Sequence, residues 1–135
     1  MPQVDPNLTT GLDGLDRVLK GLIPGDNIVW QVDRLEDVLP WVGPYARAAH
    51  KLGRRLIYFR FARHQPLVTE GAEVHELRAA EGFEPFINTI HETIARAGYG
   101  GFYLFDCLTD LAADWYSDQM LGNFFMLTCP YLYDV

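Results

Sequence analysis

Two nearly continuous apolar runs limit the folds open to this chain of 135 residues. The first, RLIYFRFA, covers residues 55–62, and the second, GFYLFD, covers residues 101–106. Strands that are apolar along both faces are typical of parallel sheets covered by helices on each side. A stretch with helical periodicity lies between the two runs. The chain therefore has the strand and helix alternation of an α/β fold.

Two weaker segments also have strand character. Residues 27–32 form a short apolar run that follows a glycine-rich turn, and residues 73–77 alternate weakly between polar and apolar side chains. We therefore expect four strands, at residues 27–32, 56–61, 73–77 and 101–106.

Helices are expected between these strands, because apolar residues recur at helical spacing in four segments. Pro40 and Pro44 lie where the second helix should begin, and Pro85 lies in the first turn of the third. A proline is harmless in a first turn, where its missing N–H has no partner. Pro130 is expected to stop or kink the last helix. The expected segments are residues 12–19, 36–52, 83–97 and 112–127.

Length and charge narrow the class of protein. A chain of this size supports one hydrophobic core, so residues 1–135 are expected to form a single domain with residues 1–9 as a tail. The net charge of −7 disfavours nucleic acid and anionic lipid as partners. No signal peptide and no membrane-spanning stretch of about 20 apolar residues is evident. The expected location is cytoplasmic, and Cys107 and Cys129 are expected to be buried, reduced thiols.

The opening segment at residues 10–26, TGLDGLDRVLKGLIPGD, carries the most specific pattern in the chain. It resembles the start of RecA-like ATPase domains of the circadian-clock KaiC kind, where the same pattern leads through a first strand into the Walker A loop. The matching residues are Thr10, Gly11, Leu12, Gly14, Leu15, Asp16, Gly21, Leu22, Pro24 and Gly25.

The resemblance implies a three-layer, P-loop NTPase-like fold with a mostly parallel sheet and helices on both faces. The family fold continues with further strands after the segment that corresponds to residues 101–127. The resemblance therefore implies that this chain is the front part of a longer domain, or that another copy covers the exposed edge of the sheet.

The loop that should bind phosphate is degenerate. Residues 33–40 read DRLEDVLP where the family carries GxxxxGK[ST], so the loop glycines, the lysine and the magnesium-binding hydroxyl are all missing. Asp33, Glu36 and Asp37 would face any polyphosphate with like charge, and Arg34 is the only cation there. We expect neither ATP nor magnesium to bind in the family's manner, no cofactor, and no catalytic residue in this chain.

Of two other positions in the family pattern, one departs from it and one matches it. The strand at residues 56–61 ends in Ala62, Arg63 and His64, where relatives place a catalytic glutamate. The run ending at Asp106 resembles a Walker B strand, and CLTDL at residues 107–111 resembles the DSLTxL that follows it. Asp106 and Asp110 are therefore the metal candidates.

The acidic residues after this strand allow two interpretations. Asp106, Asp110, Asp114 and Asp118 recur every four residues and would approach one another on a helix, which invites a cation or an arginine. Alternatively, Asp110 and Asp114 favour a helix start through the helix dipole.

Basic side chains also lie at the expected strand ends. Arg60, Arg63 and His64 follow one strand, and Asp33 and Asp106 follow two others. Ligands of parallel sheets bind outside the carboxyl ends of the strands, so an anion could bind here. Alternatively, these mixed charges pair with one another and close the cleft.

The leading hypothesis is a nucleotide-site-deficient KaiC/RecA-like domain that serves as an interaction or regulatory module. Its expected partner is another protein or an adjacent domain of a longer chain, and a homo-oligomer is an alternative. A second hypothesis follows from a looser resemblance, in IPGDNIVWQVD and LIYFRFA, to the N-terminal module of bacterial PEP synthase or pyruvate phosphate dikinase-like phosphotransferases. A third is small-anion binding at the strand ends. The candidate packing surface is aromatic: Trp115, Tyr116, Phe124, Phe125, Tyr131 and Tyr133.

Overall fold

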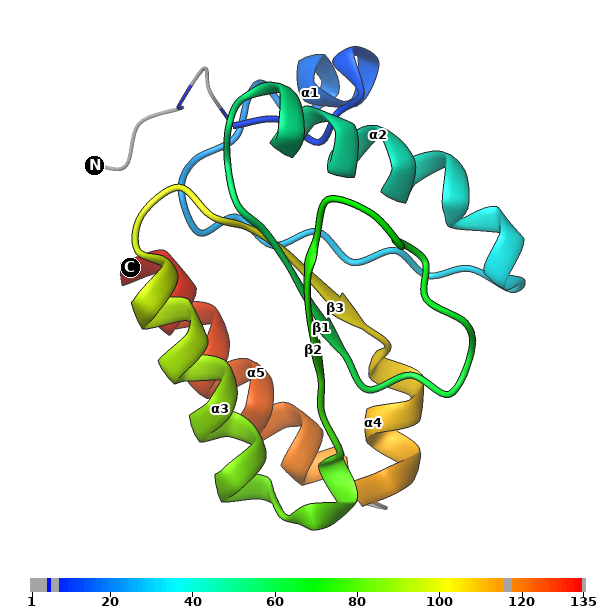
Figure 1. Ribbon diagram of the computed structural model, residues 1–135, viewed down its shortest axis with the longest axis vertical. Coiled ribbons are helices and arrows are strands. Elements are labelled where there is room, and N and C mark those ends of the chain that lie inside the picture. The colour runs from blue at the N-terminus through cyan, green and yellow to red at the C-terminus, as the bar shows by residue number, and fades with distance from the viewer. Residues whose placement is uncertain (1–4, 6–7, 116–117, 135) are drawn as a thin grey trace.

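The computed structural model describes residues 5, 8–115 and 118–134. Within this part of the chain the sheet has three parallel strands in the order β2-β1-β3 (Figure 1). The central strand β1 (Leu56–Arg60) pairs with β2 (Glu73–Glu76) on one side and with β3 (Phe102–Asp106) on the other. The α/β class and these three strands agree with the sequence prediction.

Helices cover both faces of the sheet, as Figure 1 shows. Helix α2 (Leu39–Lys51) lies over one face, and the short α1 (Asp13–Val18) lies next to α2, beyond the end of the sheet. The other face carries α3 (Phe83–Ala97), α4 (Leu108–Trp115) and α5 (Asp118–Asp134). Two 3₁₀ turns, η1 (Leu35–Asp37) and η2 (Ala79–Glu81), precede α2 and α3. No helix formed by the described residues is long and apolar enough to cross a membrane.

The alternation of side chains along β1 divides the core into two clusters. Ile57 and Phe59 are fully buried and pack toward α3 and α5. Leu56 and Tyr58 point the other way and pack under α2. The strand is apolar along its whole length because each of its faces is covered.

The expected strand at residues 27–32 is not formed. This segment is exposed, and residues 27–33 make no backbone hydrogen bond with any described residue. A strand needs a hydrogen-bonded neighbour, and the nearest edge, that of β3, is already engaged at Tyr103. The hydroxyl of Tyr45 accepts from the N–H of Tyr103 at 3.2 Å and donates to its carbonyl at 3.3 Å.

The last helical stretch also differs from expectation. Two helices, α4 and α5, replace the single segment predicted at residues 112–127, and Pro130 does not end α5, which continues to Asp134. A proline inside a helix costs about 3 kcal/mol. Packing continues across it, because Phe124, Thr128 and Leu132 lie on one face of α5 and contact the core or are buried.

The opening segment has a clear structural role. Asp16 accepts hydrogen bonds from the hydroxyls of Thr9 and Thr10 and, at 2.9 Å, from the backbone N–H of Thr10. Gly11 has φ +88° and lies so close to the backbone of Pro44 that a Cβ atom would overlap it. Asp16 therefore ties residues 9 and 10 to α1, and Gly11 lets the chain pass close to α2.

Candidate functional site

The candidate site lies at the carboxyl ends of β1 and β3. The chain leaves β1 through a loop that contains Arg63 and His64, and it leaves β3 at Asp106 and Cys107. Because the two strands are parallel and adjacent, with Arg60 in register with Asp106, both exits lie at the same edge of the sheet. Four of the residues expected from the sequence (Arg60, Arg63, His64 and Asp106) are therefore neighbours in space.

Asp106 is the centre of the site. It is only 6% exposed, and its two carboxylate oxygens have different partners. The hydroxyl of Tyr58 donates to Oδ2, and Nε2 of His64 lies 2.9 Å from Oδ1. Burial, together with this hydrogen bond, raises the pKa of the Tyr58 phenol, so Tyr58 keeps its proton and acts as a donor.

His64 is held from its other side as well. Its Nδ1 lies 2.7 Å from the backbone carbonyl of Gln65. A carbonyl oxygen can only accept a hydrogen bond, so Nδ1 carries a proton and donates it. The lone pair of a neutral ring then lies at Nε2, which faces Asp106.

Cys107 adds a thiol to the same place. Its Sγ donates to Oδ2 of Asp110 at 3.4 Å, and burial raises the pKa of the thiol. One donor atom from each of His64, Asp106 and Cys107 lies within 4.8 Å of the others. The sequence prediction of a buried, reduced thiol is only partly right, because Cys107 is half-buried; Cys129 is half-buried too, and both are free.

Arg63 pairs with the acidic residues of α4. Its backbone N–H donates to Oδ2 of Asp110 at 2.8 Å, and its guanidinium contacts Asp110 at 3.3 Å and also Asp114. Burial alone would raise the pKa of Asp110, but the hydrogen bonds from Arg63 and Cys107 and the guanidinium charge lower it. Asp110 and Asp114 therefore have an arginine partner, as one of the sequence interpretations expected.

Arg60 supports the loop instead of facing the site as a bare cation. Its side chain is 12% exposed, pairs with Glu76 at 2.7 Å and donates to the backbone carbonyl of His64. The described geometry thus uses both arginines, Arg60 and Arg63, in internal pairs.

The loop at residues 33–37 takes no part in these pairs. Asp33, Arg34, Glu36 and Asp37 are all exposed, and Arg34 contacts Glu36 at 3.4 Å. Residues 35–37 form the turn η1. Such a turn directs no glycine-rich set of N–H groups toward a ligand.

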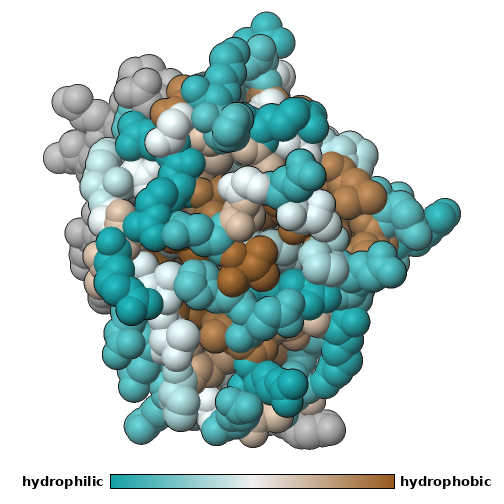
Figure 2. Space-filling model, in the orientation of Figure 1, coloured by the Kyte–Doolittle hydropathy of each residue, from teal (hydrophilic) through white to brown (hydrophobic). Residues whose placement is uncertain are grey.

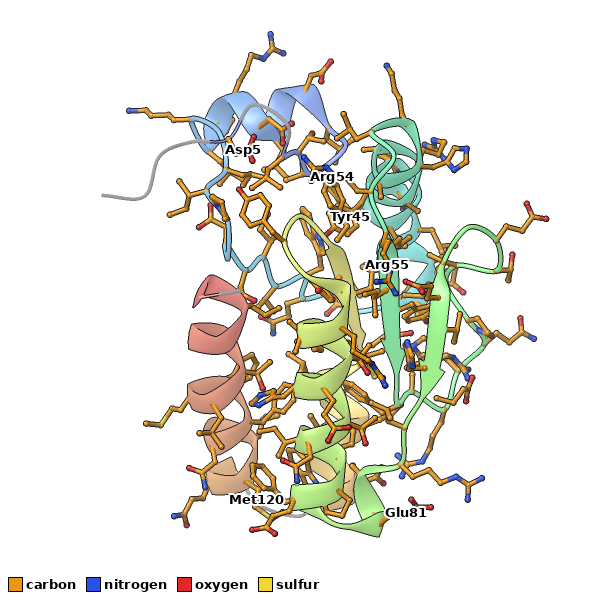
Figure 3. The ribbon with its side chains drawn as sticks, turned by 60° about the vertical axis from the view of Figure 1, so that its left-hand side comes forward. Asp5, Tyr45, Arg54, Arg55, Glu81 and Met120 are labelled. Atoms are coloured by element: carbon orange, nitrogen blue, oxygen red, sulfur yellow. The ribbon has the colours of Figure 1, made fainter. Side chains whose placement is uncertain are left out.

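A groove borders the site. It separates residues 27–33 from the outer edge of β3 and has a volume of about 690 Å³; we call it the edge groove. Tyr45 reaches from α2 to its β3 side, as Figure 3 shows. Phe124 and Thr128 of α5 line it, and so do His64, Asp106 and Cys107. The candidate site therefore opens into the groove.

Exposed apolar side chains line one side of the groove. Ile28, Val29 and Trp30 are 42%, 64% and 38% exposed, and the rings of Trp30 and Trp41 stack at 4.5 Å. Figure 2 shows apolar side chains breaking the polar surface near its right-hand edge, where α2 begins.

The three described residues of the expected aromatic surface belong to the core or lie half-buried beside it. Trp115 and Phe124 are buried, and Phe125 is half-buried. Tyr116 and the side chains of Tyr131 and Tyr133 lie outside the described part of the chain.

Sequence reasoning missed two tyrosines of the site. Tyr58 and Tyr45 look like ordinary core residues in a strand and a helix, and only their hydroxyl groups mark them as buried donors that need partners.

Comparison of the chain with protein-family models, with curated proteins and with solved structures gives no match.

Proposed function

We propose that this chain is a RecA/KaiC-like α/β module that no longer serves a nucleotide and instead binds an extended, apolar protein strand in the edge groove. The strand would belong to a neighbouring domain or a partner protein. The observation that carries the proposal is a groove between residues 27–33, which make no backbone hydrogen bond with the described residues, and the outer edge of β3, where the same is true of the groove-facing backbone of Phe105.

The two borders of the groove support strand binding in particular. On one side, residues 27–33 make no backbone hydrogen bond with the described residues. On the other side, the even-numbered residues of β3 bond to β1, as Phe102 and Asp106 show, so Tyr103 and Phe105 direct their N–H and C=O groups into the groove. Tyr45 engages those of Tyr103, and no hydrogen bond from the described residues reaches those of Phe105.

The chemistry of the occupant follows from what covers the groove. Side chains of α2 lie on one side of it and those of α5 on the other. A strand placed there is buried on both faces, so it should be apolar at nearly every position. Burial of each large apolar side chain would contribute about 1.5–3 kcal/mol. An incoming strand would displace the Tyr45 hydroxyl from Tyr103. Hydrogen bonds from that strand would replace the two lost ones, and the burial of apolar side chains would be the net gain.

Nucleotide binding is not supported by this geometry. The loop at residues 33–37 carries three carboxylates and forms a tight 3₁₀ turn without glycine. Calorimetric titration with Mg-ATP should give no heat of binding. A micromolar dissociation constant would contradict the nucleotide-deficient part of the proposal.

A tethered strand tests the binding part. A six-residue strand of valine, isoleucine and threonine is joined after α5 through a glycine and serine linker. Helix α5 ends near the loop that precedes β3, so the tether can run parallel to that strand (Figure 1). The matched control carries a central proline, which removes a ladder hydrogen bond. We expect the apolar strand to protect the Phe105 amide from hydrogen exchange and to raise Tm relative to the control.

The source of the strand is tested in the same experiment. Adding the same sequence as a separate peptide tests whether a partner protein can supply the strand. Light scattering of the untethered chain tests whether a second copy of the chain occupies the groove. Equal exchange and equal Tm for the apolar and proline versions would overturn strand binding. Membership of a PEP or pyruvate phosphotransferase stays a prediction of the resemblance.

A further inference from the structure

We propose that His64, Asp106 and Cys107 bind a single divalent transition-metal ion, with Zn²⁺ as the best fit. The three donors are an imidazole nitrogen, a carboxylate oxygen and a thiol sulfur, and they lie within 4.8 Å of one another. This set favours zinc over magnesium or calcium, which take oxygen ligands. The proposal does not depend on strand binding in the edge groove.

The contacts of His64 leave Nε2 facing a carboxylate oxygen, where either a second ring proton or a metal ion can lie between the two atoms. Nδ1 donates its proton to the carbonyl of Gln65, so a neutral ring turns a lone pair at Nε2 toward Oδ1 of Asp106. Two lone pairs at 2.9 Å repel each other unless a second proton or a metal ion lies between them. A metal ion at this point satisfies both atoms.

The surrounding contacts resemble the outer shell of a metal site. Tyr58 holds the second oxygen of Asp106, and the Gln65 carbonyl fixes the orientation of the His64 ring. Such contacts on the far side of each ligand set its tautomer and its direction. Asp110, beside Cys107, is paired with Arg63, so its charge is offset when the thiol becomes a thiolate.

The rearrangement required is small. Ligand atoms of tetrahedral zinc lie about 3.3–3.6 Å apart, from Zn–N and Zn–O lengths near 2.0 Å and Zn–S near 2.3 Å. Nε2 and Oδ1 must therefore separate slightly from 2.9 Å, while Sγ approaches them. The fourth position faces the edge groove, which the three residues line. Water or a ligand group can occupy it, as in zinc sites with three protein ligands.

Binding releases protons. The Cys107 thiol gives up its proton to solvent as the sulfur–metal bond forms, and no electron is transferred. Any proton on Nε2 of His64 leaves in the same step. Because a proton leaves when the ion binds, affinity should increase with pH.

Cobalt titration tests the site. The full chain, without a histidine tag, reduced and stripped of metal, is titrated with Co²⁺ and followed by absorbance. We expect one ion per chain, a thiolate-to-cobalt charge-transfer band, visible bands of a tetrahedral ion, and displacement by Zn²⁺. Proton release measured in weak buffer should be at least one per ion.

Matched variants locate the ligands. Cys107→Ser should abolish the charge-transfer band and weaken binding about 100-fold. Loss of a residue that only supports a ligand typically weakens metal binding about 10- to 100-fold, so loss of a ligand should cost at least as much. His64→Gln and Asp106→Asn should weaken binding similarly. The controls are Cys129→Ser and His75→Gln, which replace the other free cysteine and a histidine of β2 and should leave binding unchanged.

Two results would overturn the assignment. One is the absence of a thiolate band in the unaltered chain, and the other is a band that survives Cys107→Ser or disappears in Cys129→Ser. Circular dichroism of each metal-free variant checks its folding. If Asp106→Asn unfolds, the near-isosteric Cys107→Ser decides the question.

Discussion

The hydroxyl of Tyr45 is the group whose removal best tests what holds the outer edge of β3. It bridges the N–H and C=O of Tyr103 at 3.2 and 3.3 Å, while its ring stacks on Phe102 with centroids 5.1 Å apart. Tyr45→Phe keeps the ring and removes only the bridge. Burial raises the pKa of the Tyr45 phenol, so the group is a neutral donor and acceptor at any ordinary pH.

The magnitude follows from the two hydrogen bonds that the substitution removes. Removing one partner of a buried hydrogen bond costs about 1–3 kcal/mol, but the edge groove admits water, so the lower half of that range applies. We expect Tyr45→Phe to lower the free energy of unfolding by about 1–2 kcal/mol, or Tm by roughly 3–8 °C for a domain of this size. Urea unfolding followed by tryptophan fluorescence measures the first quantity.

The matched control is Tyr99→Phe. Its hydroxyl donates to Asp5 at 3.3 Å, but Tyr99 is 63% exposed, so the change should stay within about 0.5 kcal/mol. Hydrogen exchange at the Tyr103 amide should accelerate in Tyr45→Phe alone. If both variants lose the same stability and the Tyr103 amide exchanges at an unchanged rate, the bridge does not hold the edge of β3.

Two further predictions concern the core and the opening segment. Ile90 is fully buried under the sheet, so Ile90→Ala should cost about 2–5 kcal/mol in urea unfolding, whereas Thr89→Ala on the exposed side of α3 should cost little. Burial alone would raise the pKa of Asp16, but its hydrogen bonds from Thr9 and Thr10 lower it. The carboxylate therefore stabilises the fold above its unfolded-state pKa, near 3.9. The deficit of Asp16→Asn should be constant near neutral pH and shrink as pH falls through the folded-state pKa; a deficit that grows in acid would contradict this.

The elements that sequence analysis predicted correctly have local signals. Strand β1 is apolar at nearly every position because both faces are buried, and α3 carries one apolar stripe that ends at Gly98. Residues 27–32 have the same local signal as a strand but lack a neighbour. Strand propensity expresses packing and pairing more than backbone preference, so the composition of this segment could not decide its state.

The candidate site, too, could be predicted from the sequence only in part. The sequence placed Arg63, His64 and Asp106 at neighbouring strand ends, because parallel strands bring their carboxyl ends together. It could not assign the pairs, since the path of the loop after β1 decides that Arg63 meets Asp110 while His64 meets Asp106. Cys107 appeared inert for a similar reason, because its neighbour His64 lies 43 positions earlier in the chain.

The edge groove and the metal ligands share β3, and this arrangement predicts that they are coupled. A strand in the groove would cover the open side of His64, Asp106 and Cys107 and slow the exchange of a bound ion with solvent. The apolar tethered variant should therefore hold Zn²⁺ more tightly than its proline control. Linkage then requires zinc to raise the protection of the Phe105 amide by the same factor. Zinc affinities that agree between the two tethered variants, with protection unchanged by zinc, would show that the two sites act independently.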